Sequence, residues 1–191
     1  MPIEIRAAAA ADEPVITQIR RETWLAAYAQ IIDPEIIGRV TAPRHGASAA
    51  PPPDRTSLVA VASPGDGLAG AGAIVGYASF GPERTVVAVA SVGSGPPPGS
   101  FTPAGLAGET GELYALYVAP AHWSTGAGRA LTDATLDRLR AAGYRRVVLW
   151  TLTDNARARR FYATAGFTPD GATNVLAALG RVEELRYARD F

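Results

Sequence analysis

The chain has 191 residues, of which 48% are hydrophobic and 19% charged, enough for one domain with a full-sized core. Its 18 basic and 18 acidic residues balance, which argues against nucleic acid or an anionic membrane as a partner. All the basic residues are arginines and cysteine is absent, which excludes lysine Schiff bases, thiol nucleophiles and disulfides, and with only two histidines we expect no metal site.

The first half of the chain predicts one short strand, two helices and a strand pair. Apolar and charged residues alternate over 3–6, and aspartate followed by proline starts helices over 12–28 and 33–40. Strand-like residues at 58–62 and 73–80 flank a proline and glycine cluster that suits an antiparallel pair. The N-terminus lacks the apolar core of a signal peptide, and no apolar run approaches ~18 residues, so we expect a cytoplasmic protein.

Two stretches rich in proline, glycine and small residues, 41–56 and 91–111, are expected to be irregular connections within the domain. The second half then alternates strands and helices. The predicted elements are strand 114–118, a helix from 128 to 143, strand 146–151, a helix from 154 to 165, and strands 167–169 and 182–188. This order predicts a single α/β domain over 1–191, with a mixed sheet flanked by helices.

The stretch 112–131 joins an apolar strand to a helix through Pro120 and a glycine-containing turn. Such a turn brings backbone N–H groups to the positive end of a helix, which suits a phosphate. A dinucleotide motif would need glycine where Leu131 stands and a carboxylate after the strand that ends at Thr151. A P-loop needs lysine, which is absent. Neither familiar nucleotide motif is therefore present.

Two longer motifs identify a family. LYALYVAPAHWSTGAGRAL is followed by NARARRFYATAGF, with further similarity in ETWLAAYAQIIDPE, IVGYASFGPER and VEELRYAR. The chain resembles the GNAT superfamily of N-acetyltransferases that use acyl-CoA. The resemblance implies a mixed sheet of about seven strands with about four helices, and acetyl-CoA as cosubstrate. At the head of the phosphate loop, Trp123 and Ser124 replace the family's usual glutamine or arginine and glycine, and His122 beside them is expected at the surface.

The resemblance assigns cofactor roles to the first motif. The backbone of Leu116, Tyr117 and Val118 is expected to bond the pantetheine arm like an added strand. The pyrophosphate is expected on backbone amides of the loop and the first helical turn, and Arg129, Arg159 and Arg160 are candidates for the 3′-phosphate. The loop residues are Ser124, Thr125, Gly126, Ala127, Gly128 and Arg129.

Catalytic roles follow from the second motif and the central strand. Tyr162 stands where the family's general acid stands and is also expected beside the cofactor, seven residues after Asn155. Asn155 either bonds the pantetheine arm or caps its helix. Glu112 matches a general-base glutamate of some members, and a chain of waters is the alternative base.

The acceptor is predicted least sharply. Trp24 and Tyr28 lie four residues apart on one helical face and either pack in the core or wall the acceptor pocket. The resemblance implies acetyl transfer to a primary amine of a small molecule by direct attack in a ternary complex. A non-catalytic acyl-CoA sensor, a protein N-terminal acetyltransferase and a nucleotide-sugar or NAD enzyme remain alternatives, and a homodimer is as open as a monomer.

Overall fold

The computed structural model describes residues 3–42, 54–62, 72–84 and 110–191. The stretches predicted to be irregular, 41–56 and 91–111, lie mostly outside these ranges, as does the predicted turn at 64–67. Thr41 ends a helix, Thr56 begins a strand, and Thr110 begins the central strand. The irregular stretches are therefore shorter at their described ends than the composition suggested.

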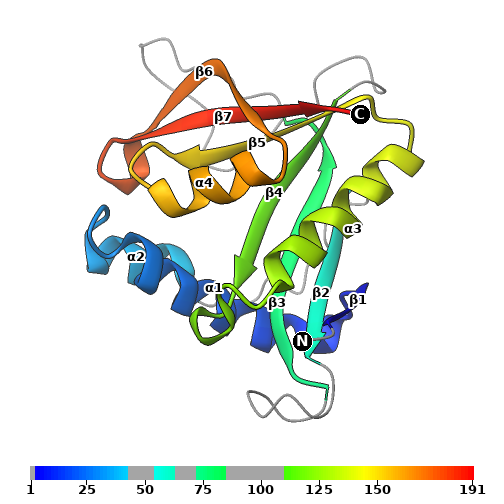
Figure 1. Ribbon diagram of the computed structural model, residues 1–191. Coiled ribbons are helices and arrows are strands. Elements are labelled where there is room, and N and C mark those ends of the chain that lie inside the picture. The colour runs from blue at the N-terminus through cyan, green and yellow to red at the C-terminus, as the bar shows by residue number, and fades with distance from the viewer. Residues whose placement is uncertain (1–2, 43–53, 63–71, 85–109) are drawn as a thin grey trace.

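A single seven-stranded sheet forms the centre of the molecule, with strand order β1-β2-β3-β4-β5-β7-β6 (Figure 1). All neighbouring strands are antiparallel except β4 and β5. The predicted mixed sheet is thereby confirmed. The strands are β1 (Ile3–Ala7), β2 (Thr56–Ala62), β3 (Ile74–Pro82), β4 (Thr110–Val118), β5 (Arg146–Leu152), β6 (Thr168–Leu176) and β7 (Val182–Asp190).

Four helices cover the two faces of this sheet. Helices α3 and α4 share one apolar core with the sheet, while α1 and α2 pack on the opposite side in two further clusters. The count agrees with the prediction, and each predicted start or end lies within a few residues of the observed one. The helices are α1 (Glu13–Tyr28), α2 (Pro34–Thr41), α3 (Ala127–Ala141) and α4 (Ala156–Thr164).

The parallel pair β4 and β5 is joined only at its start. Thr110–Glu112 pairs with Arg146–Val148, and beyond that point the two strands run apart (Figure 1). One long edge of β4 is consequently left without a strand partner from Leu113 onward. An unpaired edge exposes N–H and C=O groups that need other partners.

A bulge in β4 sets which side chains face each layer. Ser79 lies opposite Ala115 and Phe80 opposite Leu113, so Tyr114 is the extra residue. Leu113 therefore shares the face of α3, whereas Ala115 and the following Tyr117 belong to the core under α1. The bulge thus turns Tyr117 toward α1.

Two local expectations were wrong. The sequence PDG at 169–171 reads as a strand end, yet β6 continues to Leu176, because Gly171 adopts a positive φ of 91° within an irregularity that lets the strand resume. Asp12 precedes α1 without capping it: its carboxylate accepts from Arg6 at 2.7 Å and from the Ala9 amide at 2.8 Å. The ion pair and the preceding turn claim the oxygens that would otherwise cap the helix.

Candidate active site

A cavity of about 620 Å³ occupies the space where β4 and β5 part. Its walls come from β4, the loop between β4 and α3, and the first turn of α3. The end of β5, helix α4 and the end of α1 complete them. Most of the residues predicted to form the site meet here. Those on the wall are Tyr28, Leu116, Tyr117, Val118, Ser124, Gly126, Gly128, Arg129, Asn155 and Tyr162.

The open edge of β4 presents backbone groups to this cavity. The Ala119 amide donates to Val75 of β3 at 2.9 Å, so by strand alternation Leu116 and Val118 point their backbone groups away from β3. The Val118 carbonyl accepts from the Thr23 hydroxyl at 3.0 Å and from the Trp123 indole at 2.8 Å. The groups of Leu116 and the Val118 amide remain to receive an extended ligand.

The loop after β4 forms a cluster of unpaired backbone donors. Ser124 and Gly126 have positive φ values of 64° and 97°, which coil the chain immediately before α3. Within the part of the chain that the structure describes, the amides of 124–129 have no hydrogen-bond acceptor. Consecutive free amides at a helix N-terminus form a site for an anion. Thr125 turns its hydroxyl back to the His122 carbonyl at 2.8 Å.

The two glycines of this loop serve different purposes. Gly126 is required by its positive φ, and a Cβ there would meet nothing within 4 Å. Gly128 has no such backbone constraint, and a Cβ there would lie 3.5 Å from the Phe161 ring. Gly126 therefore shapes the loop, whereas the missing side chain at Gly128 keeps the cavity wall open between α3 and α4.

Trp123 is anchored on both sides. Its indole N–H bonds Val118, and the guanidinium of Arg157 from α4 lies 3.9 Å from its ring centroid. Trp123, which departs from the family pattern, thus connects the loop to α4. Neighbouring His122 is buried, not at the surface as expected, because its short 3-10 turn (Pro120–His122) faces it inward, and its Nδ1 has no partner among the described residues.

Tyr162 is buried on the wall of the cavity. Its ring packs edge-on against Phe161 and Phe167, with centroids 5.3 and 6.0 Å away. Burial raises the pKa of Tyr162 above its ordinary value, and the nearby Tyr117 acts in the same direction. The hydroxyl therefore stays protonated around neutral pH and is available as a donor.

Tyr28 and Trp24 are neighbours with different exposure to the cavity. Their rings meet edge-on with centroids 5.2 Å apart. Tyr28 lies on the cavity wall, whereas Trp24 stands behind it and donates its indole N–H to the Tyr117 hydroxyl at 2.9 Å. Burial raises the pKa of Tyr28, against the effect of a hydrogen bond with Asn155.

Glu112 is buried and bound to Arg84. One carboxylate oxygen accepts from the Arg84 amide at 2.8 Å, and the other accepts from the guanidinium Nε at 3.0 Å and from Nη2. Glu112 is not among the described residues that line the cavity. The structure thus gives this carboxylate an arginine partner and does not bring it to the wall beside Tyr162.

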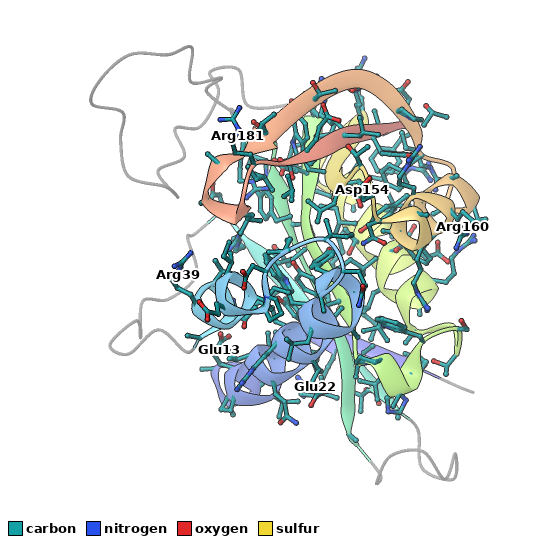
Figure 2. All side chains as sticks on the ribbon, turned by 90° about the vertical axis from the view of Figure 1, so that its left-hand side faces the viewer. Glu13, Glu22, Arg39, Asp154, Arg160 and Arg181 are labelled. Atoms are coloured by element: carbon teal, nitrogen blue, oxygen red, sulfur yellow. The ribbon has the colours of Figure 1, made fainter. Side chains whose placement is uncertain are left out.

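Some polar residues at α4 make hydrogen bonds within the protein, and others line the cavity. Asn155 caps the helix by accepting from the Ala158 amide at 3.0 Å. Arg159 is held by the Thr153 carbonyl and the Tyr187 hydroxyl, at 3.0 and 3.3 Å. Arg160 lines the cavity and projects from the outer side of α4 (Figure 2). Of the three arginines predicted near the 3′-phosphate, Arg129 and Arg160 reach the cavity.

Sequence reasoning missed Thr23 and Arg157, and it did not predict the contact between Trp24 and Tyr117. Thr23 bonds Val118 from α1, the Tyr117 hydroxyl accepts from Trp24, and Arg157 stacks on Trp123. The residues of the Thr23–Val118 and Trp24–Tyr117 pairs are 95 and 93 positions apart in sequence, so no local pattern predicts these contacts. For Arg157 the signal was present, since it belongs to the second motif, but the three arginines of that motif look alike in sequence.

The described residues include neither a cluster of metal-binding side chains nor a helix that could cross a membrane. No group of three or more histidine, aspartate or glutamate side chains in ranges 3–42, 54–62, 72–84 and 110–191 is placed to hold a metal ion. Over the same ranges, no helix has the length and hydropathy needed to cross a membrane.

Solved structures with this fold include acetyltransferases. PaiA N-acetyltransferase from Thermoplasma acidophilum, in complex with coenzyme A, superposes with a TM-score of 0.66 at 17% identity, covering 100% of both chains. YncA from Salmonella typhimurium, with its cofactor acetyl-CoA, gives a TM-score of 0.61 at 22% identity, over 100% of this chain and 94% of the other. At these identities the likeness concerns the fold.

Curated relatives match a shorter segment. Mycothiol acetyltransferase from Beutenbergia cavernae is 55% identical over 60 residues, 31% of this chain and 20% of the relative. The enzyme of that name from Cellulomonas flavigena is 42% identical over 86 residues, 44% of this chain and 25% of the relative. The matched segment thus spans about a fifth to a quarter of these relatives.

The family model described as "Acetyltransferase (GNAT) family" matches residues 16–167, most of the chain and all the walls of the cavity. The family and the acyltransferase class predicted from the two motifs are thereby confirmed. The chain belongs to the acetyltransferase (GNAT) family.

Proposed function

We propose that this protein transfers an acetyl group from acetyl-CoA to a primary amine of a small molecule, by direct attack within a ternary complex. One observation carries the proposal. Where β4 and β5 part, a free strand edge, six free amides and a protonated tyrosine line one cavity. These are the groups that a thioester on a long phosphorylated arm requires.

Acetyl-CoA would lie along β4 with its phosphates at α3. The amides of 124–129 would hold the pyrophosphate, and Gly128 would leave room for the arm between α3 and α4. Leu116 and the Val118 amide would bond the pantetheine as a strand does. The bond from Trp123 to the Val118 carbonyl removes one acceptor from that edge. Asn155 keeps its oxygen on the helix cap, so that it would act on the arm by fixing the position of α4.

The reaction forms a C–N bond and breaks a C–S bond. The neutral amine attacks the thioester carbonyl, a free amide of the β4 edge stabilises the developing oxyanion, and the sulfur departs as a thiolate. Tyr162 gives that thiolate its proton, since burial keeps the hydroxyl protonated at neutral pH. The amine nitrogen loses one proton over the same sequence, and an equivalent proton returns to the Tyr162 phenolate, so that the net products are the amide and the free thiol of CoA.

Glu112 is a poor direct acceptor of that proton in this arrangement. Both of its oxygens are engaged by Arg84, and it is off the described cavity wall. We therefore assign the proton to water in the cavity, and assign Glu112 the task of fixing Arg84 beside the start of β4. The Glu112→Gln variant distinguishes these roles, as set out below.

The acceptor would enter from the side of α1. Tyr28 and Trp150 are on the wall there, with Trp24 supporting Tyr28 from behind. Aromatic walls of this size suit a small acceptor. The name of the mycothiol acetyltransferases supports a small-molecule acceptor, through the segment of 60 to 86 residues that this chain shares with them.

The test is a thiol-release assay with acetyl-CoA and a panel of amines. The chain contains no cysteine, so every thiol detected comes from CoA. We expect turnover with at least one class of small amine, and turnover lower by about 100-fold or more with Tyr162→Phe at the same CoA saturation. Thermal stabilisation by CoA without turnover on small amines, amino acids or peptides would make the protein an acyl-CoA sensor. Turnover only with peptide N-termini would contradict a small-molecule acceptor and would make the protein an N-terminal acetyltransferase.

A further inference from the structure

Trp123 and Arg157 form a bridge across the cavity between the phosphate loop and α4. Both residues line the cavity, and the guanidinium carbon of Arg157 lies 3.9 Å from the centroid of the indole. The indole is itself fixed by its bond to the Val118 carbonyl at 2.8 Å. The strand edge therefore holds the tryptophan, and the tryptophan holds the arginine.

Arg157 differs from the neighbouring arginines that already have polar partners. Arg129 makes an ion pair with Asp133 at 2.9 Å, and Arg159 bonds a carbonyl and a tyrosine hydroxyl. Within the described ranges Arg157 has neither a carboxylate nor a carbonyl partner, and its guanidinium stacks on the Trp123 ring. A guanidinium that stacks on an aromatic face keeps its N–H fork free for an anion.

The position of the stack indicates which anion. Trp123 directly precedes Ser124, the first of the residues whose amides are free. A guanidinium lying over the indole is consequently beside the anion site formed by those amides. Arginine binds phosphate oxygens in a bidentate manner and more strongly than neutral donors do.

We propose that Arg157, positioned by Trp123, binds the pyrophosphate of CoA. This rests on the proposed function, because it assumes that CoA occupies the cavity. Arg157 supplies charge to a loop that carries none of its own at 123–128. The tryptophan that departs from the family pattern becomes a positioning residue: it holds the arginine and does not touch the phosphate.

The experiment measures dissociation constants by titration calorimetry for CoA, dephospho-CoA and pantetheine. Dephospho-CoA lacks the 3′-phosphate, and pantetheine lacks all phosphates. We expect Arg157→Ala to weaken CoA and dephospho-CoA alike by about 10- to 100-fold, as loss of a charged hydrogen bond does, and to leave pantetheine unchanged. The control is Arg39→Ala, an equal change of charge on α2, far from α4 in Figure 2, which should leave all three constants unchanged.

The role of Trp123 is tested by comparing the CoA affinities of single and double variants at Trp123 and Arg157. Trp123→Phe keeps a ring for stacking and should retain most of the affinity, whereas Trp123→Leu should approach the loss seen in Arg157→Ala. In the Arg157→Ala background, Trp123→Leu should add little, because its effect passes through the arginine. Independent, additive losses would contradict positioning of Arg157 by Trp123.

The outcomes separate this inference from the function on which it rests. If the unaltered protein binds CoA and Arg157→Ala binds it equally, the inference is wrong and the proposed function stands. A loss seen with CoA but absent with dephospho-CoA would move Arg157 to the 3′-phosphate and overturn the assignment. Failure of the unaltered protein to bind CoA would overturn both.

Discussion

The indole N–H of Trp24 donates to the phenolic oxygen of Tyr117 at 2.9 Å, joining α1 to the central strand across 93 residues of sequence. Both side chains are half-buried, and burial raises the pKa of Tyr117. The bond fixes α1, and therefore Tyr28, against β4, the strand along which we propose that the thioester lies. It thus connects the proposed acceptor wall with the proposed cofactor wall.

Removing the Tyr117 hydroxyl should destabilise the fold. Tyr117→Phe leaves the half-buried Trp24 indole N–H without its protein acceptor, at a cost of about 1 kcal/mol in the free energy of unfolding. Denaturant unfolding followed by circular dichroism measures this. In a Trp24→Phe background the same change should cost much less, and an equal cost there would show that the bond does not contribute.

Tyr162→Phe should lower kcat by about 100-fold or more while leaving the affinity for CoA nearly unchanged. The ring and its contacts with Phe161 and Phe167 remain, and only the proton donor is lost. Because burial raises the pKa of Tyr162, its deprotonation should not limit the rate of the unaltered enzyme at moderately alkaline pH. Steady-state kinetics from pH 6 to pH 9 and a CoA titration test both statements; full activity in Tyr162→Phe would remove this tyrosine from the mechanism.

The two loop glycines should respond differently to alanine. Gly126→Ala forces a positive φ of 97° on a residue with a Cβ, so it should lower stability by about 1 kcal/mol and disturb the free amides. Gly128→Ala meets only ordinary contact with Phe161 and should fold normally, yet its methyl group stands in the cavity and should weaken CoA binding. Melting temperatures and CoA titrations, compared between the two variants, decide this. Unchanged CoA affinity in Gly128→Ala would place the cofactor arm elsewhere.

Glu112→Gln should act mainly on stability. It leaves Arg84 beside an uncharged partner in a largely buried setting, and we expect a loss of about 2–4 kcal/mol in the free energy of unfolding. If water takes the amine's proton, the pH dependence of kcat should keep its shape in this variant at a temperature where it is folded. Loss of the acid limb of the profile would instead identify Glu112 as the base.

Glu184 provides a test of stability against pH. Burial raises the pKa of its carboxyl above 4.5, opposed by a hydrogen bond from Asn174 at 2.9 Å. A carboxyl whose pKa is raised on folding favours the folded state when protonated, so this contribution is lost as pH rises from about 4.5 through the raised value. Glu184→Gln should therefore be more stable than the unaltered protein at pH 7, with the difference closing by pH 4. A difference that stays constant with pH would contradict the burial effect.

The elements of the fold were predictable because their signals are local. Asp33 accepts from the Glu35 amide at the start of α2, and Gly143 ends α3 with a positive φ of 91°, as the sequence suggested. The parting of β4 and β5 was not predictable, because strand register depends on contacts far apart in sequence. The bulge at Tyr114 also depends on contacts far apart in sequence. Without knowledge of the bulge, the face of the sheet on which Tyr117 lies cannot be predicted.

The candidate site shows the same division. The loop glycines and Tyr162 stood out because short motifs contain them. The partners that determine their behaviour did not: Arg84 at Glu112, Val118 at Trp123 and Trp24 at Tyr117. Each is a contact between different elements, formed only when the sheet and helices assemble.

The most direct test of the account follows a labelled acetyl group. The protein is incubated with acetyl-CoA carrying ¹³C in its acetyl group and with the amine panel, and products are identified by mass spectrometry. The account predicts that the label appears on the amine nitrogen at the rate at which free CoA appears, and that Tyr162→Phe slows both equally. Label that remains on CoA, or leaves as acetate whichever amine is present, would contradict acetyl transfer by this chain.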